Sequence, residues 1–296
     1  MGSTVPPLSI TRRDGLATLS IAFGMKIFDT HTHVFPDKIA RQAVAHLREL
    51  SNGIPAYTDG TAADLAVKAA EAGYDGWMNC PVVTRAGQAH SVNAWAAALN
   101  QWPHLSLGGV HPDDEDKPAI LRQILDSGLH GLKLHPEYQE FCLDDSRMDG
   151  VWDFCEEHEL PVLIHAGEDI GFRPPYHSDP KAFVELARRH PKLTIVAAHT
   201  GGWKLWDELE NLLPASRNLF IETSFSMPFM KERGQMLRII RKIGVSQVLF
   251  GTDSPWGELR QSIQDIATCG LEPKELEAVF WGNARSVWKR CPELQA

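Results

Sequence analysis

Short apolar segments rich in β-branched residues alternate along the chain with longer amphipathic segments. The apolar segments have the length of buried β-strands, whereas the amphipathic ones have the period of helices that bury one face. Strands are predicted at residues 26–30, 76–82, 106–110, 131–134, 161–164, 194–198, 219–223 and 247–251. Helices are predicted at residues 92–102, 119–127, 148–158, 180–189, 203–213, 235–243 and 259–268.

The helix at residues 180–189 carries boundary signals at both ends. Asp179 precedes Pro180, which places an N-cap residue before a proline at the first helical position. The pair His190-Pro191 ends the helix, because proline cannot continue the helical hydrogen-bond pattern. This segment is therefore a well-delimited helix in the sequence.

The sustained alternation of strands and helices predicts a parallel sheet, because parallel neighbours need crossover connections. Eight such units closing on themselves form a (β/α)8 TIM barrel, for which 296 residues is an ordinary length. An open doubly wound sheet is the competing fold. It would carry a glycine-rich phosphate-binding turn after the first strand, where this chain has Asp29-Thr30-His31-Thr32-His33. We predict one barrel domain at residues 25–296 and an N-terminal extension at residues 1–24.

The composition narrows the expected partners. The chain has 29 Lys and Arg against 38 Asp and Glu, a net charge of −9, which disfavours binding to a nucleic-acid backbone. We expect no membrane association, since no apolar run has the length of a transmembrane helix. The five cysteines are odd in number and form no CxxC pair, which predicts a cytoplasmic protein. A small-molecule substrate is the expected partner, and a homo-oligomer is left open.

Residues of the metal-binding type follow most of the predicted strands. In chain order they are His31, His33, His111, His135, His165, His199 and Asp253. For His111 and His135 a ligand role and an ordinary polar role are equally open. His31 and His33 are a better signal, because alternate residues of an extended strand point the same way.

Five residues of this pattern would meet at one end of a barrel. The C-terminal ends of TIM-barrel strands share one mouth, where catalytic groups lie. The residues expected to converge there are His31, His33, His165, His199 and Asp253. Neutral imidazoles together with a carboxylate suit Zn²⁺ or a similar divalent ion. The sequence therefore predicts a metal centre at the barrel mouth.

The segment Phe28-Asp29-Thr30-His31-Thr32-His33 resembles the first-strand motif of the amidohydrolase superfamily. The likeness continues in residues 131–136, 161–167, 198–202, 249–256 and 281–284. It runs from about Met25 to the end of the chain. The chain is most similar to the amidohydrolase 2 branch, which contains predicted metal-dependent hydrolases and aminocarboxymuconate-semialdehyde decarboxylase-like enzymes.

The resemblance implies a cofactor of one or two divalent ions, with zinc as the expected metal. The ligands of a single-metal site are matched by His31, His33, His165 and Asp253. His199 matches a sixth-strand histidine that is a second ligand or an acid/base partner. Lys133 matches a position at which binuclear relatives carry a carbamylated lysine bridging two metals.

Asp253, His199 and Lys133 are the expected catalytic residues. A divalent ion lowers the pKa of its bound water toward ~7, and Asp253 would accept the proton and deliver it to the leaving group. His199 would stabilise oxyanion charge if it is not a ligand. Three roles are open for Lys133: a bridging carbamate, a lysine of depressed pKa that contacts substrate, or a structural lysine paired with a carboxylate such as Glu222.

The loops supply candidate substrate-binding residues. Arg85, Arg173 and Tyr176 follow the second and fifth strands, and an arginine there would bind a carboxylate of the substrate. A solvated surface role is the alternative for either arginine. Trp203 and Trp256 follow the sixth and eighth strands and are candidates for lining the pocket.

Hydrolysis of an amide, lactone or ester bond in a small anionic molecule is the leading functional hypothesis. The alternative is non-oxidative decarboxylation of a small aromatic or unsaturated carboxylic acid, which the same ligands support. A metal-dependent phosphoesterase fits less well, since the related deoxyribonucleases carry glutamate where this chain has Lys133. An inactive metal-binding barrel also fits less well, because a decayed site would lose Asp253 without penalty to the fold.

Overall fold

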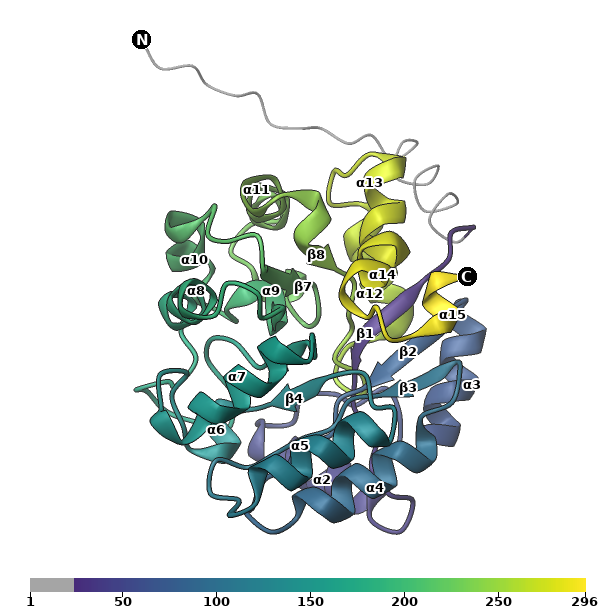
Figure 1. The fold of residues 1–296 in the computed structure, drawn as a ribbon. Helices are drawn as coiled ribbons and strands as arrows, with labels where there is room; N and C mark the ends of the chain where they lie inside the picture. The colour runs from purple at the N-terminus through teal and green to yellow at the C-terminus, as the bar shows by residue number, and fades with distance from the viewer. Residues whose placement is uncertain (1–23) are drawn as a thin grey trace.

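Parallel strands form a closed barrel with helices around it in the computed structural model, which describes residues 24–296 (Figure 1). The strands are β1 (Phe28–Thr32), β2 (Gly76–Asn79), β3 (His104–Ser106), β4 (Leu132–Leu134), β5 (Val162–Ile164), β6 (Ile195–Ala197), β7 (Leu219–Glu222) and β8 (Val248–Leu249). One sheet joins β1 to β3 and a second joins β4 to β8, each in sequence order. Parallel bridges at Gly108–Leu132 and Thr32–Ser254 connect the two sheets and close the barrel. The predicted (β/α)8 TIM barrel is confirmed.

Helices follow the strands and surround the barrel (Figure 1). They are α2 (Ala40–Leu50), α3 (Ala62–Ala72), α4 (Ala89–Leu99), α5 (Lys117–Asp126), α6 (Pro136–Gln139), α7 (Asp149–Glu157), α8 (Pro180–Arg189), α9 (Ala198–Gly201), α10 (Trp206–Leu212), α11 (Gly234–Ile243), α12 (Leu259–Ala267), α13 (Pro273–Glu277), α14 (Asn283–Val287) and α15 (Pro292–Gln295). Every predicted strand and helix overlaps an observed one, whereas α2, α3, α6, α9, α13 and α15 were not predicted. Within residues 24–296, no helix has the length and apolar character needed to cross a membrane. Of the predicted N-terminal extension, only Gly24 belongs to the described residues.

Local capping explains where two of the helices begin and end. The Asp179 side chain accepts a hydrogen bond from Ala182 N at 2.9 Å, as expected for the N-cap of α8. The unpredicted α3 has equally clear signals. Thr61 Oγ1 accepts from Asp64 N at 3.1 Å, and Gly73 ends the helix with a φ of 88°, which glycine adopts without a steric penalty.

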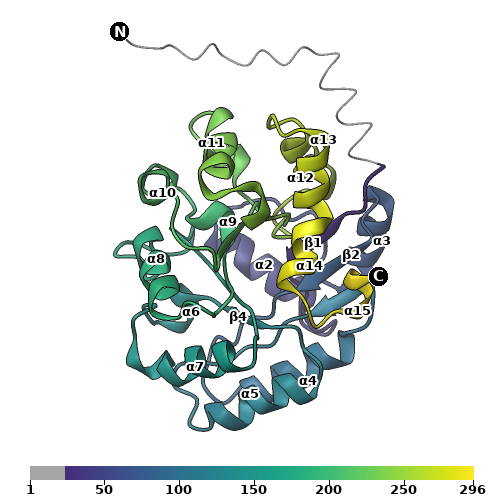
Figure 2. The ribbon, with the colours of Figure 1, turned by 45° about the horizontal axis from the view of Figure 1, so that its top comes forward.

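The strands direct alternate side chains to the inside and the outside of the barrel. The inward cluster includes Phe28, Met78, Leu105, Leu163, Val196 and Leu249. It continues into Trp281 and Trp288 near α14, and the Trp281 ring meets Phe28 with centroids 6.5 Å apart. The segment around α14 therefore covers the end of the barrel at which β1 begins (Figure 2). The polar side chains of the barrel interior lie at the opposite end, where the strands finish.

The first strand changes register before it reaches that opposite end. The pairing of β1 with β2 shifts between Asp29 and Thr32. Phe28 belongs to the inward cluster, and in a regular strand His31, three residues later, would point to the opposite face. The irregularity turns His31 inward, so that it and His33 reach the barrel mouth together.

Asp29 joins β1 to β8 where the barrel closes. Its buried carboxyl group, whose pKa burial raises to about 8, accepts hydrogen bonds from His31 N at 3.0 Å, Thr252 N at 3.0 Å and Thr252 Oγ1 at 2.6 Å. A backbone hydrogen bond from Thr30 N to Phe250 O at 2.9 Å lies beside it. The side chain therefore holds together the two strands that carry His31 and Asp253.

Replacing Asp29 with Ala is expected to lower the free energy of unfolding by about 3 kcal/mol, because buried donors at this seam lose their acceptor. Urea unfolding followed by circular dichroism measures the change. Asp126→Ala, at the exposed end of α5, is the matched control and should shift stability by less than about 0.5 kcal/mol. Equal stabilities of the two variants would contradict this role of Asp29.

Candidate active site

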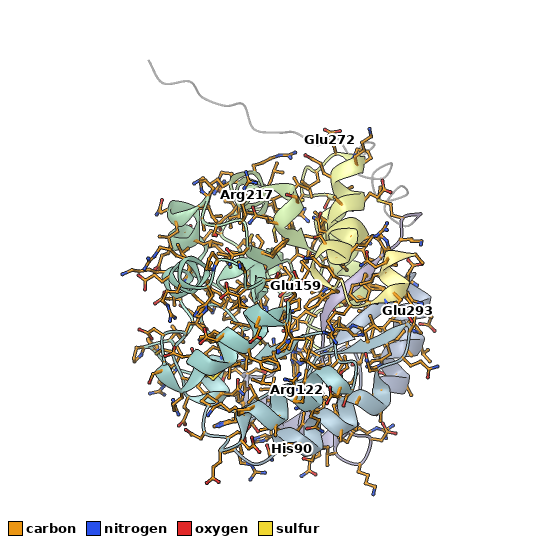
Figure 3. The ribbon with its side chains drawn as sticks, in the orientation of Figure 1. His90, Arg122, Glu159, Arg217, Glu272 and Glu293 are labelled. Atoms are coloured by element: carbon orange, nitrogen blue, oxygen red, sulfur yellow. The ribbon has the colours of Figure 1, made fainter. Side chains whose placement is uncertain are left out.

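The C-terminal ends of six strands bring polar side chains together at the barrel mouth. They are His31, His33, Lys133, His165, His199, Glu222 and Asp253, all buried except the half-buried His33. Other charged side chains, such as Arg217 and Glu272, lie on the outer surface (Figure 3). Buried titratable groups gathered at the active end of a barrel mark a candidate active site.

Three of these residues form a compact donor group. The Nε2 atoms of His31 and His33 lie 3.0 Å apart. Asp253 Oδ1 lies 3.1 Å from His33 Nε2 and 3.5 Å from His31 Nε2. Ligands that each sit about 2.0–2.1 Å from one ion are separated by about 3–3.5 Å, so this spacing fits a single divalent metal. Two imidazoles and a carboxylate are also suitable ligand types.

Glu222 holds the donor group from within the barrel. Its Oε1 lies 3.0 Å from His31 Nδ1 and accepts hydrogen bonds from His199 N at 2.9 Å and Ser224 Oγ at 2.7 Å. A carboxylate at Nδ1 keeps the proton on that nitrogen, which leaves the Nε2 lone pair of His31 for a metal. Gly251 makes room for this carboxylate, because a Cβ there would collide with Glu222 Oε2.

Burial and neighbouring charge keep His31 and Asp253 in their metal-binding forms. Burial lowers the pKa of His31 well below its usual value, and the nearby Lys133 lowers it further, so the ring is neutral. Burial by itself would raise the pKa of Asp253. The hydrogen bond from His33 and the nearby imidazoles outweigh that effect and lower the pKa, which keeps the carboxylate ionised.

His165 connects to the donor group through His199. His165 Nδ1 lies 3.0 Å from His199 Nε2. Burial lowers the pKa of His165 to about 3 and that of His199 to about 4, so both rings are neutral near pH 7. His165 lies outside the compact group formed by His31, His33 and Asp253. Its role as the fourth metal ligand therefore stays a prediction.

Two residues of the site have unusual backbone conformations. His199 has a φ of 55° and Asp253 a φ of 62°. Residues with a Cβ rarely adopt this left-handed region, and such strain tends to gather at functional sites. The backbone conformation of His199 is stabilised by Trp206, whose Nε1 donates a hydrogen bond to His199 O at 3.0 Å.

Lys133 points into the cluster. Its Nζ lies 2.8 Å from His31 Nε2, and the residue is 1% exposed. Burial lowers the pKa of Lys133, while nearby acidic groups that include Asp253 and Glu222 oppose the shift. The structural alternative, in which Lys133 turns away to pair with Glu222, does not match this geometry. The carbamate and substrate-contact roles both stay predictions.

A second donor group lies beside the first. His135 Nε2 is 3.3 Å from Asp169 Oδ2, and His165 Nε2 is 3.8 Å from the same oxygen. The rings of His135 and His165 stack with centroids 4.2 Å apart. The structure thus places His135 in the site. His111 instead accepts a hydrogen bond from Asp113 N at 3.1 Å and does not line the cavity at the barrel mouth.

A cavity of about 570 Å³ opens onto both donor groups. Its aromatic lining consists of Phe35, Trp95, Tyr138, Trp203, Phe225 and Trp256. Trp203 and Trp256 thus lie where the sequence suggested. A concave apolar pocket with a few convergent polar groups is the usual form of a small-molecule site.

The predicted substrate-binding residues do not line this cavity. Arg85 and Arg173 are exposed to solvent, and Tyr176 is half-buried in its loop. The geometry gives them no contact with the cavity, so their role in substrate binding stays a prediction. Asp169 and Tyr138 were not predicted from the sequence, because they lie in short segments without strand or helix periodicity.

A parallel barrel with a histidine and aspartate cluster at its C-terminal strand ends has the architecture of a metal-dependent barrel enzyme. The amidohydrolase family profile matches residues 28–290. The chain belongs to this family, which confirms the resemblance seen in its motifs. No curated protein matches the sequence.

Solved structures share the fold at low sequence identity. An uncharacterized TIM-barrel protein from Bordetella bronchiseptica has a TM-score of 0.73 at 19% identity, covering 90% of this chain and 99% of its own. The 2,6-dihydroxybenzoate decarboxylase from Rhizobium has a TM-score of 0.67 at 17% identity, with coverage of 90% and 99%. The 5-carboxyvanillate decarboxylase from Novosphingobium aromaticivorans, complexed with manganese and a nitrobenzoic acid, has a TM-score of 0.66 at 14% identity, with coverage of 90% and 97%.

His31→Ala and His33→Ala are each expected to lower the amount of bound divalent metal, because each removes one member of the compact donor group. The protein is loaded with zinc or with manganese, passed over a desalting column and measured by inductively coupled plasma mass spectrometry. His90→Ala, at an exposed position of α4, is the matched control. Full metal retention in a folded double variant of His31 and His33 would show that the metal lies elsewhere.

Proposed function

We propose that the protein is a divalent-metal-dependent, non-oxidative decarboxylase of aromatic carboxylic acids. The observation that carries the proposal is that the donor groups line a cavity whose walls also carry aromatic side chains. An aromatic ring would pack against those walls, while its carboxylate reaches the ligand-type residues. A small aromatic acid thus matches the cavity in shape, and a divalent ion held by the donor groups would attract its carboxylate.

Known decarboxylases with this fold support the proposal. The Rhizobium and Novosphingobium proteins act on 2,6-dihydroxybenzoate and 5-carboxyvanillate, which are both aromatic acids. The Novosphingobium structure contains manganese, so we widen the expected metal from zinc to zinc or manganese. Hydrolysis, the first hypothesis from the sequence, uses the same donor groups but has no separate observation in its favour.

The donor groups suggest how the reaction is divided among residues. A divalent ion held by His31, His33 and Asp253, with His165 as a fourth candidate, would supply a Lewis acid for the substrate's oxygen atoms. Decarboxylation breaks the bond between the ring carbon and the carboxylate and leaves the electron pair on the ring carbon. That carbon must then receive a proton as CO₂ departs. We assign proton delivery to Asp253, whose ionised carboxylate would first take a proton from a water beside it and then pass it to the ring carbon, while the hydroxide left behind combines with the departing CO₂ as bicarbonate.

His199 and Lys133 supply hydrogen bonds and charge around the same position. His199 is neutral and buried, so its ring can donate to an oxygen of the substrate without adding a charge. Lys133 lies close enough to His31 to meet a substrate oxygen bound next to it. An amine placed there would offset the negative charge that builds up on the ring.

Metal-loaded protein is expected to release CO₂ from a panel of hydroxybenzoic acids that includes 2,6-dihydroxybenzoate and 5-carboxyvanillate. Asp253→Asn should lose on the order of 10²-fold or more in rate, since it cannot carry the proton. Trapped CO₂ and the decarboxylated phenol are measured together by chromatography. Asp126→Asn, on the surface, is the control. Cleavage of an ester or lactone panel with no CO₂ from any acid would favour the hydrolase hypothesis instead.

Lys133→Met removes the amino group and keeps an unbranched apolar stem. We expect kcat/KM for decarboxylation to fall on the order of 10²–10³-fold with unchanged metal content, because an oriented donor is lost. Steady-state rates and metal content are measured on the same preparation. A fall from two ions to one, with a CO₂ adduct in the intact mass of the unaltered protein, would establish the bridging carbamate. Normal turnover would make Lys133 structural.

A further inference from the structure

The cavity is much larger than an aromatic acid needs. A buried apolar cavity of about 150 Å³ is enough for one benzene molecule. The cavity of this protein has about 570 Å³, about four times as much. The donor groups belong to the wall formed by the strand ends, whereas residues in and around α2 and α4 form another wall, so a small substrate bound at the donor groups leaves most of the space unfilled.

The extra space has a different lining from the donor end. It is bounded by α2, the segments on either side of it and α4, which contribute Ile39, Leu47, Leu50, Ile54, Val92 and Trp95 together with the uncharged polar Ser51 and Ser91. No titratable residue of the lining comes from α2 or α4. Leu47 and Leu50 line the same cavity as His31 and Asp253, which places α2 on the mouth side of the barrel. We call this part of the cavity the apolar arm.

The apolar arm leaves hydrophobic side chains in contact with water. Ile39 is 50% exposed and Leu50 is 47% exposed. Both line the same cavity as His31 and Asp253, so the exposed apolar surface is continuous with the donor groups. Apolar surface of this kind, next to a polar centre, indicates a ligand with one polar and one apolar end.

We infer that the ligand of this site is amphipathic: an aromatic carboxylic acid that carries an alkyl chain or second apolar ring on the side away from the carboxylate. The inference rests on the proposed function for the position of the carboxylate. The acid end meets the donor groups, and the apolar substituent lies between α2 and α4, where it covers Leu47, Leu50 and Trp95. Burial of these side chains by the ligand then contributes directly to affinity.

Binding of a homologous series tests the inference. Benzoate and its 4-butyl, 4-hexyl and 4-octyl derivatives are titrated into metal-loaded protein and followed by isothermal calorimetry. Affinity is expected to rise about threefold to fourfold for each CH₂ until the arm is full, since each buried methylene adds a similar free energy. An affinity that stays flat along the series overturns the inference.

Variants locate the apolar substituent. Leu47→Glu and Ile54→Glu should each weaken 4-octylbenzoate by on the order of tenfold or more and change benzoate by less than about twofold. Val67→Glu is the matched control, because Val67 is 57% exposed on α3 and does not line the cavity. Equal losses for benzoate and 4-octylbenzoate would mean that the variants disturb the donor end, and the arm would have no ligand of its own.

Two further outcomes separate this inference from its alternatives. If Leu50→Glu converts an oligomer to a monomer on analytical ultracentrifugation, and affinity is flat along the series, the arm is a contact between copies of the chain and the inference is wrong. If affinity rises along the series but no acid releases CO₂, the amphipathic ligand stands and only the proposed decarboxylation fails.

Discussion

The rest of the site depends on the hydrogen bonds that the buried carboxylate of Glu222 accepts. It receives hydrogen bonds from His199 N and Ser224 Oγ and lies 3.0 Å from His31 Nδ1. A charge buried inside the barrel is tolerated only when its hydrogen bonds are satisfied, and here those bonds come from groups that the chemistry needs. One residue therefore orients a metal-ligand candidate from β1 and a catalytic candidate from the end of β6.

The closure of the barrel is a second constraint, because the compact donor group comes from its first and last strands. The register shift in β1 turns His31 toward the mouth, and Asp29 fastens β1 to β8. His33 and Asp253 are thereby brought within 3.1 Å of each other although they lie at opposite ends of the chain. The apolar packing around Trp281 fills the other end of the barrel and leaves the mouth as the place for polar groups.

The mouth has two chemically different parts. The strand ends supply the charged and imidazole groups, while α2 and α4 supply apolar side chains. This division follows from the architecture of the barrel. The strand ends hold the catalytic side chains rigidly, and the segments between the strands shape the space for the substrate. Hydrogen bonds at the strand ends can therefore position the reacting atoms of the substrate. Contacts with the apolar side chains can determine which substituents the substrate carries elsewhere.

The sequence by itself determined the barrel and the kind of chemistry at its mouth. Short apolar strands that alternate with amphipathic helices specify a parallel barrel, because each pattern follows from which side chains are buried. The histidines that follow the strands predicted a cluster of metal-binding side chains. Only the tertiary structure showed that Glu222 supports His31, that His165 reaches the cluster through His199, and that Asp169 and Tyr138 join the site. It also left Arg85 and Arg173 in solvent. Periodicity reports which face of an element is buried, but side-chain contacts between distant segments depend on how all the strands close together, which no local pattern records.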